Sequence, residues 1–168
     1  GVIATSVDSA DVLVTDKFRR TVKLLCFLGK GLPIVGPQWL LHSKAAMHLV
    51  DPWEHILSDK ESETKFNTNL RDSLIKSGKN PILKGFHIYI TKNVKPQPDE
   101  IKAIVSSSGG VVVSRAPSVW PSNSVAISCP EDKAMWTKLK NKIPVVSTEW
   151  LLQGVLQQNL KMEDHILK

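Results

Sequence analysis

Arg19, Arg20 and Lys23 are three cations within a short stretch near the beginning of the sequence. In a helix, with about 100° between successive residues, they would fall within one arc of roughly 100°. Cations at the start of a helix oppose the macrodipole, which favours anions there. A lysine, a forked arginine and free backbone N–H groups together suit a phosphate and a carboxylate. The stretch therefore predicts an anion-binding surface, and a solvated basic face is the alternative interpretation.

A helix is expected to carry these cations. Thr15 and Asp16 are residue types that cap helix N-termini, and Gly29 is typical of a helix end. An apolar face is predicted from residues three or four apart, namely Phe18, Val22, Leu25 and Leu28. The three cations would point away from most of this face.

The composition is that of an ordinary soluble domain, with 42% hydrophobic and 23% charged residues among 168. The net charge of +6 is compatible with an acidic partner, but the lysines and arginines form no long run, so general DNA coating is only a weak hypothesis. No apolar run approaches the ~20 residues of a membrane span, and no membrane partner is expected. Cys26 and Cys129 are far apart, which favours a reducing compartment.

The sequence contains an internal repeat. Pro33 and Trp39 match Pro144 and Trp150 at the same spacing, and each Pro–Trp pair spans a short apolar strand and the start of a helix. His55-Ile56-Leu57 matches His165-Ile166-Leu167 after one deletion. Two copies indicate a duplicated domain rather than a solenoid. We predict that Trp39 and Trp150 are core residues.

The second copy predicts the fold of both. Strands are expected at residues 82–91, 111–113 and 124–128, with helices at 99–108 and 132–140, followed by the strand and helix shared with the first copy. This order is typical of an α/β fold with a mostly parallel four-stranded sheet flanked by helices. We expect a first repeat at residues 1–57, a linker region at 58–80 and a second repeat at 81–168.

The first copy begins late relative to the second. Residues 1–4 match 110–113 and residues 12–15 match 125–128, so both are expected to be strands. The strand and helix that precede them in the second copy are expected upstream of this sequence. In the linker region, Phe66, Leu70, Leu74 and Ile75 predict an amphipathic helix that ends at Gly78 and packs across the junction.

No catalytic pattern is present. The five histidines lack metal-ligand spacing, and the sequence has no phosphate-binding GxxxxGK[ST] loop, GxGxxG fingerprint or GxSxG elbow. We therefore expect no enzyme activity, no metal and no cofactor.

The duplicated unit with matched tryptophans, the Gly109-Gly110 pair and the linker helix resembles tandem BRCT domains over essentially the whole chain. Arg20-Thr21-Val22-Lys23 resembles the R-T-x-K signature of those members that read phosphopeptides. The resemblance implies that Lys23 binds the phosphate, that Thr21 supports the pocket and that Arg20 binds the peptide three residues after the phosphoserine. It also implies that Pro117 touches the last peptide side chain.

The implied partner is a phosphoserine peptide, in particular the phosphorylated C-terminal tail of a variant histone read by a DNA-damage-response scaffold on nuclear chromatin. Other phosphoproteins of that response are further candidates. In the family, a Ser or Thr followed by Gly at the end of the first strand completes the phosphate pocket, and that strand belongs to the expected upstream segment. Two alternatives stay open. One is a binder of DNA ends or backbone, and the other is a phosphorylation-independent protein-interaction module.

Overall fold

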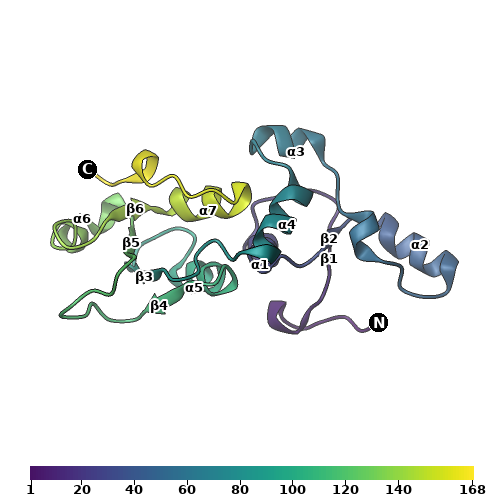
Figure 1. Cartoon of the computed structure of the whole chain (residues 1–168), viewed down its shortest axis with the longest axis horizontal. Coiled ribbons are helices and arrows are strands. Elements are labelled where there is room, and N and C mark those ends of the chain that lie inside the picture. Colours follow the sequence, from purple (N-terminus) through teal and green to yellow (C-terminus); the bar gives the residue numbers. More distant parts are fainter.

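The computed structural model describes residues 1–168, and its elements divide between two repeats and a linker (Figure 1). The first repeat contains β1 (Leu13–Val14), α1 (Val22–Lys30), β2 (Ile34–Val35) and α2 (Gln38–Ala46). The linker contains α3 (Lys60–Lys65) and α4 (Leu70–Lys79). The second repeat contains β3 (His87–Ile90), α5 (Pro98–Ser107), β4 (Val111–Val113), β5 (Ser124–Ser128), α6 (Lys133–Trp136), β6 (Val145–Ser147) and α7 (Thr148–Gln157). Short 3-10 helices lie at Val7–Ser9, Pro52–His55, Pro130–Asp132 and Glu163–His165.

The second repeat is built on the predicted four-stranded parallel sheet, in the order β4-β3-β5-β6. Ile88 of β3 pairs with Val112 on one side and Val125 on the other. Every residue of β5 is buried, as expected for an inner strand of a parallel sheet covered by helices. The sequence predicted these elements in the right order, with two differences in their bounds. The first strand begins only at His87, because residues 82–85 form a turn, and the helix predicted at 132–140 is the short α6, followed by turns at 137–140.

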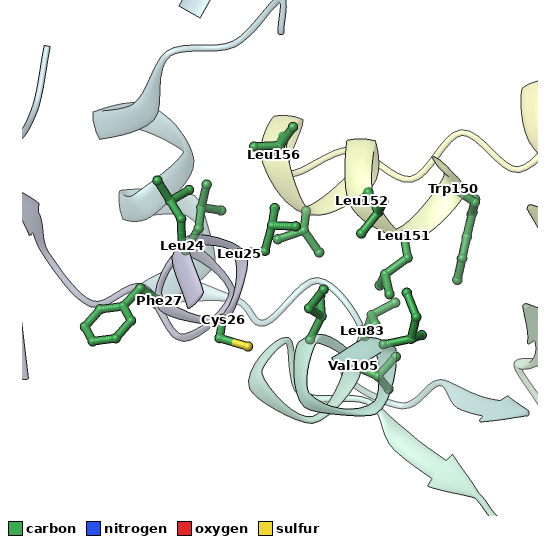
Figure 2. Close-up of a cluster of buried hydrophobic side chains, with 14 of the residues drawn as sticks. Leu24, Leu25, Cys26, Phe27, Leu83, Val105, Trp150, Leu151, Leu152 and Leu156 are labelled. Carbon is green, nitrogen blue, oxygen red and sulfur yellow. The ribbon is translucent and has the colours of Figure 1, made fainter. Parts of the chain in front are cut away.

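The first repeat has only two strands, β1 and β2, which pair in parallel. The prediction of a strand at residues 1–4 is wrong, because within this chain they have no neighbouring strand to pair with. Helix α2 is also less covered than its counterpart α7. Leu40 and Leu41 are 50% and 58% exposed, whereas the matched Leu151 and Leu152 of α7 are 0% and 6% exposed. In the second repeat these leucines lie near Leu83, which leads into β3, and near α5 (Figure 2).

Helix α1 starts and ends later than the sequence predicted. Thr21 is its N-cap and accepts a 3.2 Å hydrogen bond from the backbone N–H of Leu24, and Gly31 is its C-cap. The predicted cap Asp16 instead pairs with Arg19. The expected start before Phe18 and end at Gly29 are therefore wrong. A residue with a φ of 66°, the left-handed conformation that favours glycine, comes only at Gly31.

Helix α1 lies in the centre of the molecule, between the second repeat and the rest of the first (Figure 1). Residues 24–29 are all buried, because α1 is packed against α4, α5 and α7. Leu25 faces α7, Cys26 faces α5 and Phe27 points away from the second repeat (Figure 2). These side chains belong to one core cluster that includes residues of both repeats and the linker. Both matched tryptophans, Trp39 and Trp150, are buried as well.

The linker contains two helices where the sequence predicted one. Leu70 and Leu74 of α4 are fully buried and Ile75 is partly exposed, so α4 does pack across the junction. Its hydroxyl groups add polar contacts to both repeats. Ser73 donates to the carbonyl of Leu156 in α7 at 2.8 Å, and Ser77 donates to the carbonyl of Gly29 in α1 at 2.7 Å.

The contact between α1 and α4 predicts an unusually harmful substitution. A Cβ atom at Gly31 would lie 2.5 Å from backbone atoms of Gly78, and its φ is also positive. Gly85 has a φ of 84° but open space around it. We expect Gly85→Ala to cost about 1–2 kcal/mol of unfolding free energy from backbone strain alone and Gly31→Ala to cost clearly more. Urea denaturation of the chain measures both, and equal costs would show that α1 and α4 are not in close contact.

Candidate anion-binding site

The first turn of α1 presents free hydrogen-bond donors. Thr21 satisfies the N–H of Leu24, but the N–H groups of Val22 and Lys23 have no hydrogen-bond partner in the chain. The Lys23 side chain is exposed and takes part in none of the ion pairs. No acidic residue lies in this first turn. The helix dipole, two free amides and one ammonium group therefore make this end of α1 attractive to an anion.

The other two cations of the predicted cluster already have carboxylate partners. Arg19 pairs with Asp16 at 2.7 Å, and this hydrogen bond lowers the pKa of the Asp16 carboxyl. Arg20 pairs with Glu149 at 2.7 Å. Both arginines precede α1, so the prediction that they share one helical arc with Lys23 is wrong. Lys23 is the cation of this cluster that is left unpaired.

The ion pair of Arg20 connects the first repeat to the second. Glu149 lies in the first turn of α7, where a negative charge complements the helix dipole. The two side chains are 31% and 47% exposed, so solvent weakens their attraction. Glu149 accepts from one terminal guanidinium nitrogen, Nη2. Because a guanidinium carries five N–H donors, Arg20 can bind a second carboxylate without releasing the first.

The second repeat contains a cleft of ≈ 560 Å³. It lies where β3, β5 and β6 end, which is the usual ligand position in open parallel sheets. Thr148, the neighbour of Glu149, lines it. The other lining residues are Lys92, Asn93, Val94, Lys95, Gln97, Pro98, Cys129 and Glu131. Most of its lining residues are of polar types, and they include two unpaired lysines and one carboxylate.

A buried carboxylate shapes the loop on one side of this cleft. Asp132 accepts from the backbone N–H of Asn93 at 2.9 Å and from its side-chain amide at 2.7 Å. Burial opposes ionisation of Asp132, but hydrogen bonds from Thr91 and Asn93 outweigh it and lower the pKa of the carboxyl. The loop at residues 92–97 is thus anchored in the second repeat.

Pro117 does not join these residues. It belongs to the loop between β4 and β5, which extends outward from the second repeat, away from α1 (Figure 1). The structure therefore keeps Arg20, Thr21 and Lys23 together at the start of α1, and the residue of the second repeat that it places against them is Glu149 rather than Pro117. The contact with Glu149 was not predicted from the sequence. Arg20 and Glu149 are 129 positions apart, and no local pattern marks such a pair.

The chain belongs to the BRCT family. A BRCT domain model matches residues 81–166. Mediator of DNA damage checkpoint protein 1 from Homo sapiens is 38% identical over 99% of this chain, and PAX-interacting protein 1 from Bos taurus is 33% identical over 98%. The chain spans only 8% and 18% of the lengths of these relatives.

Solved tandem BRCT structures share the fold. The BRCT5-BRCT6 domains of S. pombe Brc1 superpose with a TM-score of 0.78 and 24% identity, covering 98% of this chain and 86% of that one. A complex of Rtt107p with a phosphorylated histone gives a TM-score of 0.62 at 15% identity, covering 96% and 77%. The expected arrangement of two BRCT repeats is thereby confirmed.

The Arg20–Glu149 pair predicts a measurable coupling between the repeats. In a double-mutant cycle with Arg20→Gln and Glu149→Gln, we expect a coupling energy of about 0.2–1 kcal/mol in unfolding free energy at low salt. It should shrink in 1 M salt, because the pair is partly exposed. Urea denaturation of the four proteins measures it. Zero coupling at low salt would show that the pair does not form in solution.

Proposed function

We propose that this chain is a non-catalytic phosphoserine-peptide-binding module of a DNA-damage-response scaffold that acts on nuclear chromatin. The observation that carries the proposal is the unpaired Lys23 ammonium group beside the two free N–H groups of Val22 and Lys23. Two of the similar proteins support the setting, since one is named as a mediator of the DNA damage checkpoint and the other forms a complex with a phosphorylated histone.

Phosphate chemistry fits this end of α1. A phosphoserine carries a charge of about −1.5 to −2 and three strong acceptor oxygens at neutral pH. Lys23 would supply a charge-assisted hydrogen bond, and the two free amides would donate to the remaining oxygens, as in other phosphate sites at helix N-termini. Thr21 supports this arrangement as the N-cap that fixes the first turn.

The position of Arg20 beside the proposed phosphate site favours a peptide whose C-terminus lies a few residues after the phosphoserine. Arg20 lies next to the phosphate site, points to the second repeat and keeps free donors after binding Glu149. The guanidinium fork suits a terminal carboxylate. The cleft lined by Thr148, the residue before Glu149, offers space for a peptide side chain on the second repeat. We therefore infer a phosphorylated C-terminal tail, such as that of a variant histone, with other damage-response phosphoproteins as further partners. The position of Pro117 does not favour a role in this contact.

The proposal includes an upstream strand and helix that complete the first repeat. Support comes from α2, whose Leu40 and Leu41 are exposed where the matched leucines of α7 are buried near α5. Such a segment would end its strand next to α1, as β3 ends at the cleft of the second repeat. It would supply the Ser or Thr and Gly that the family uses for phosphate. The binding experiments below therefore use the parent polypeptide.

We expect Lys23→Met to weaken binding of a phosphoserine peptide by about tenfold or more, because a charged hydrogen bond is worth roughly 1.5–3 kcal/mol. Lys76→Met is the matched control, since Lys76 on α4 is exposed and also unpaired. Calorimetric titration measures both, with the unphosphorylated peptide for comparison. Unchanged affinity in Lys23→Met, with unchanged hydrogen-exchange protection of α1, would refute the proposal.

A second experiment asks whether Arg20 recognises the peptide terminus. The peptide has a phosphoserine, three further residues and either a free or an amidated end. We expect amidation to weaken binding to the natural protein by about tenfold, because it removes the charge that pairs with the guanidinium. Arg20→Gln should bind both peptides alike. Equal binding of both peptides to the natural protein would contradict the carboxylate contact, and an unchanged preference in Arg20→Gln would assign it to another residue.

A further inference from the structure

Asp59 accepts three hydrogen bonds at the junction between the linker and the first repeat. As the N-cap of α3 it accepts from the backbone N–H of Ser62 at 3.2 Å and from the Ser62 hydroxyl at 2.8 Å. It also accepts from the backbone N–H of Phe18 at 3.1 Å, a residue 41 positions earlier. The Phe18 hydrogen bond is the main cause of a lowered pKa of the Asp59 carboxyl, which therefore stays ionised at neutral pH.

Residues at both ends of helix α3 contact Phe18. Asp59 precedes the helix and binds the Phe18 backbone, while Phe66 follows it and packs edge-on against the Phe18 ring, with centroids 5.3 Å apart. The Phe18 side chain is almost completely buried. The linker thus fixes the position of Phe18, which lies two residues before Arg20 and five before Lys23.

Few other interactions fix the backbone of the segment after Phe18. The backbone N–H groups of residues 19–21 donate no hydrogen bond, and the segment forms neither helix nor strand. Its exposed arginines bind only through their side chains. The path from Phe18 to the start of α1, and with it the direction of Arg20, is therefore set by the anchor at Phe18 and by the Thr21 cap.

We propose that Asp59 is a positioning residue that fixes Arg20 relative to Lys23 for peptide binding. This inference rests on the proposed function of the site. Asp59 contacts the backbone before Arg20 rather than the peptide. Losing the anchor leaves the arginine to be ordered during binding, and ordering free side chains lowers affinity.

The direction in which Asp59→Ala changes the affinity for the phosphopeptide distinguishes a positioning role from a simple effect of charge. Lys17 and Arg19 both interact electrostatically with Asp59, so its negative charge belongs to the same surface as the cations. Removing a negative charge from this surface would by itself strengthen the attraction of a phosphate. If Asp59 positions Arg20, its replacement should instead weaken peptide binding. Weaker binding of the peptide by Asp59→Ala could therefore not be explained by the change in charge.

Asn69→Ala provides a matched control. Asn69 is the N-cap of α4 in the same linker and accepts from the backbone N–H of Asp72 at 2.9 Å, so its replacement also removes one linker-helix cap. It makes no hydrogen bond to the segment before α1. A merely structural role of Asp59 would therefore be reproduced by Asn69→Ala.

The test compares the natural parent polypeptide, Asp59→Ala and Asn69→Ala by hydrogen exchange without ligand and by titration with the phosphoserine peptide ending in a free carboxylate. We expect Asp59→Ala to exchange faster at residues 18–23 and to bind about tenfold more weakly. Asn69→Ala should change neither. The inference is overturned if the two variants behave alike, or if Asp59→Ala loosens the segment but binds as tightly as the natural protein. Failure of the natural protein to bind would instead reject the proposed function.

Discussion

The packing of α1 against three helices is the interaction on which the rest of the structure depends. Close approach is possible because glycines stand where α1 meets its neighbours. A Cβ atom at Gly29 would lie 2.6 Å from the Ser108 hydroxyl oxygen, just after α5, and one at Gly31 would meet Gly78 of α4. The buried surface of α1 thereby joins both repeats and the linker in one core. The two repeats cannot shift independently without opening this core.

The candidate site follows from the same constraint. Because the body of α1 is buried, its exposed N-terminal turn is held at the border between the repeats. Two carboxylates from outside the first repeat order the segment that leads into it, Asp59 through the backbone of Phe18 and Glu149 through Arg20. Lys23 and the amides beside it are left without partners. A rigid framework thus surrounds an unsatisfied set of donors, which is the arrangement that favours anion binding.

Sequence periodicity was sufficient for the fold of the second repeat. Its strands are short apolar runs between clear turn signals, and helix α5 has a regular apolar face that includes Ile101, Ile104 and Val105. It was less informative for α1, because a helix buried on all sides has no polar face that marks its ends. The cap was misplaced for a related reason. Thr15, Asp16 and Thr21 are all capping types, but Thr15 and Asp16 make other local hydrogen bonds and only Thr21 accepts from an N–H group of α1.

The site could be predicted only in part from the sequence. Arg20, Thr21 and Lys23 were predicted as site residues because they are close in sequence and match a family signature. Glu149 and Asp59 were not, since their contacts with the segment before α1 join positions far apart in the sequence. The loop containing Pro117 follows β4, and no local sequence pattern indicates that this loop extends away from α1 (Figure 1).

The central claim is that the N-terminal turn of α1 and the neighbouring cleft bind one phosphopeptide. Amide chemical shifts of a ¹⁵N-labelled polypeptide comprising both repeats test it most directly, in titrations with the phosphorylated and unphosphorylated forms of one peptide. We expect the phosphorylated form alone to cause the largest shifts at Val22 and Lys23, with further shifts at Thr148 and in the loop at residues 92–98. Shifts confined to α6 or to the β4–β5 loop, or equal shifts with the unphosphorylated peptide, would contradict the account.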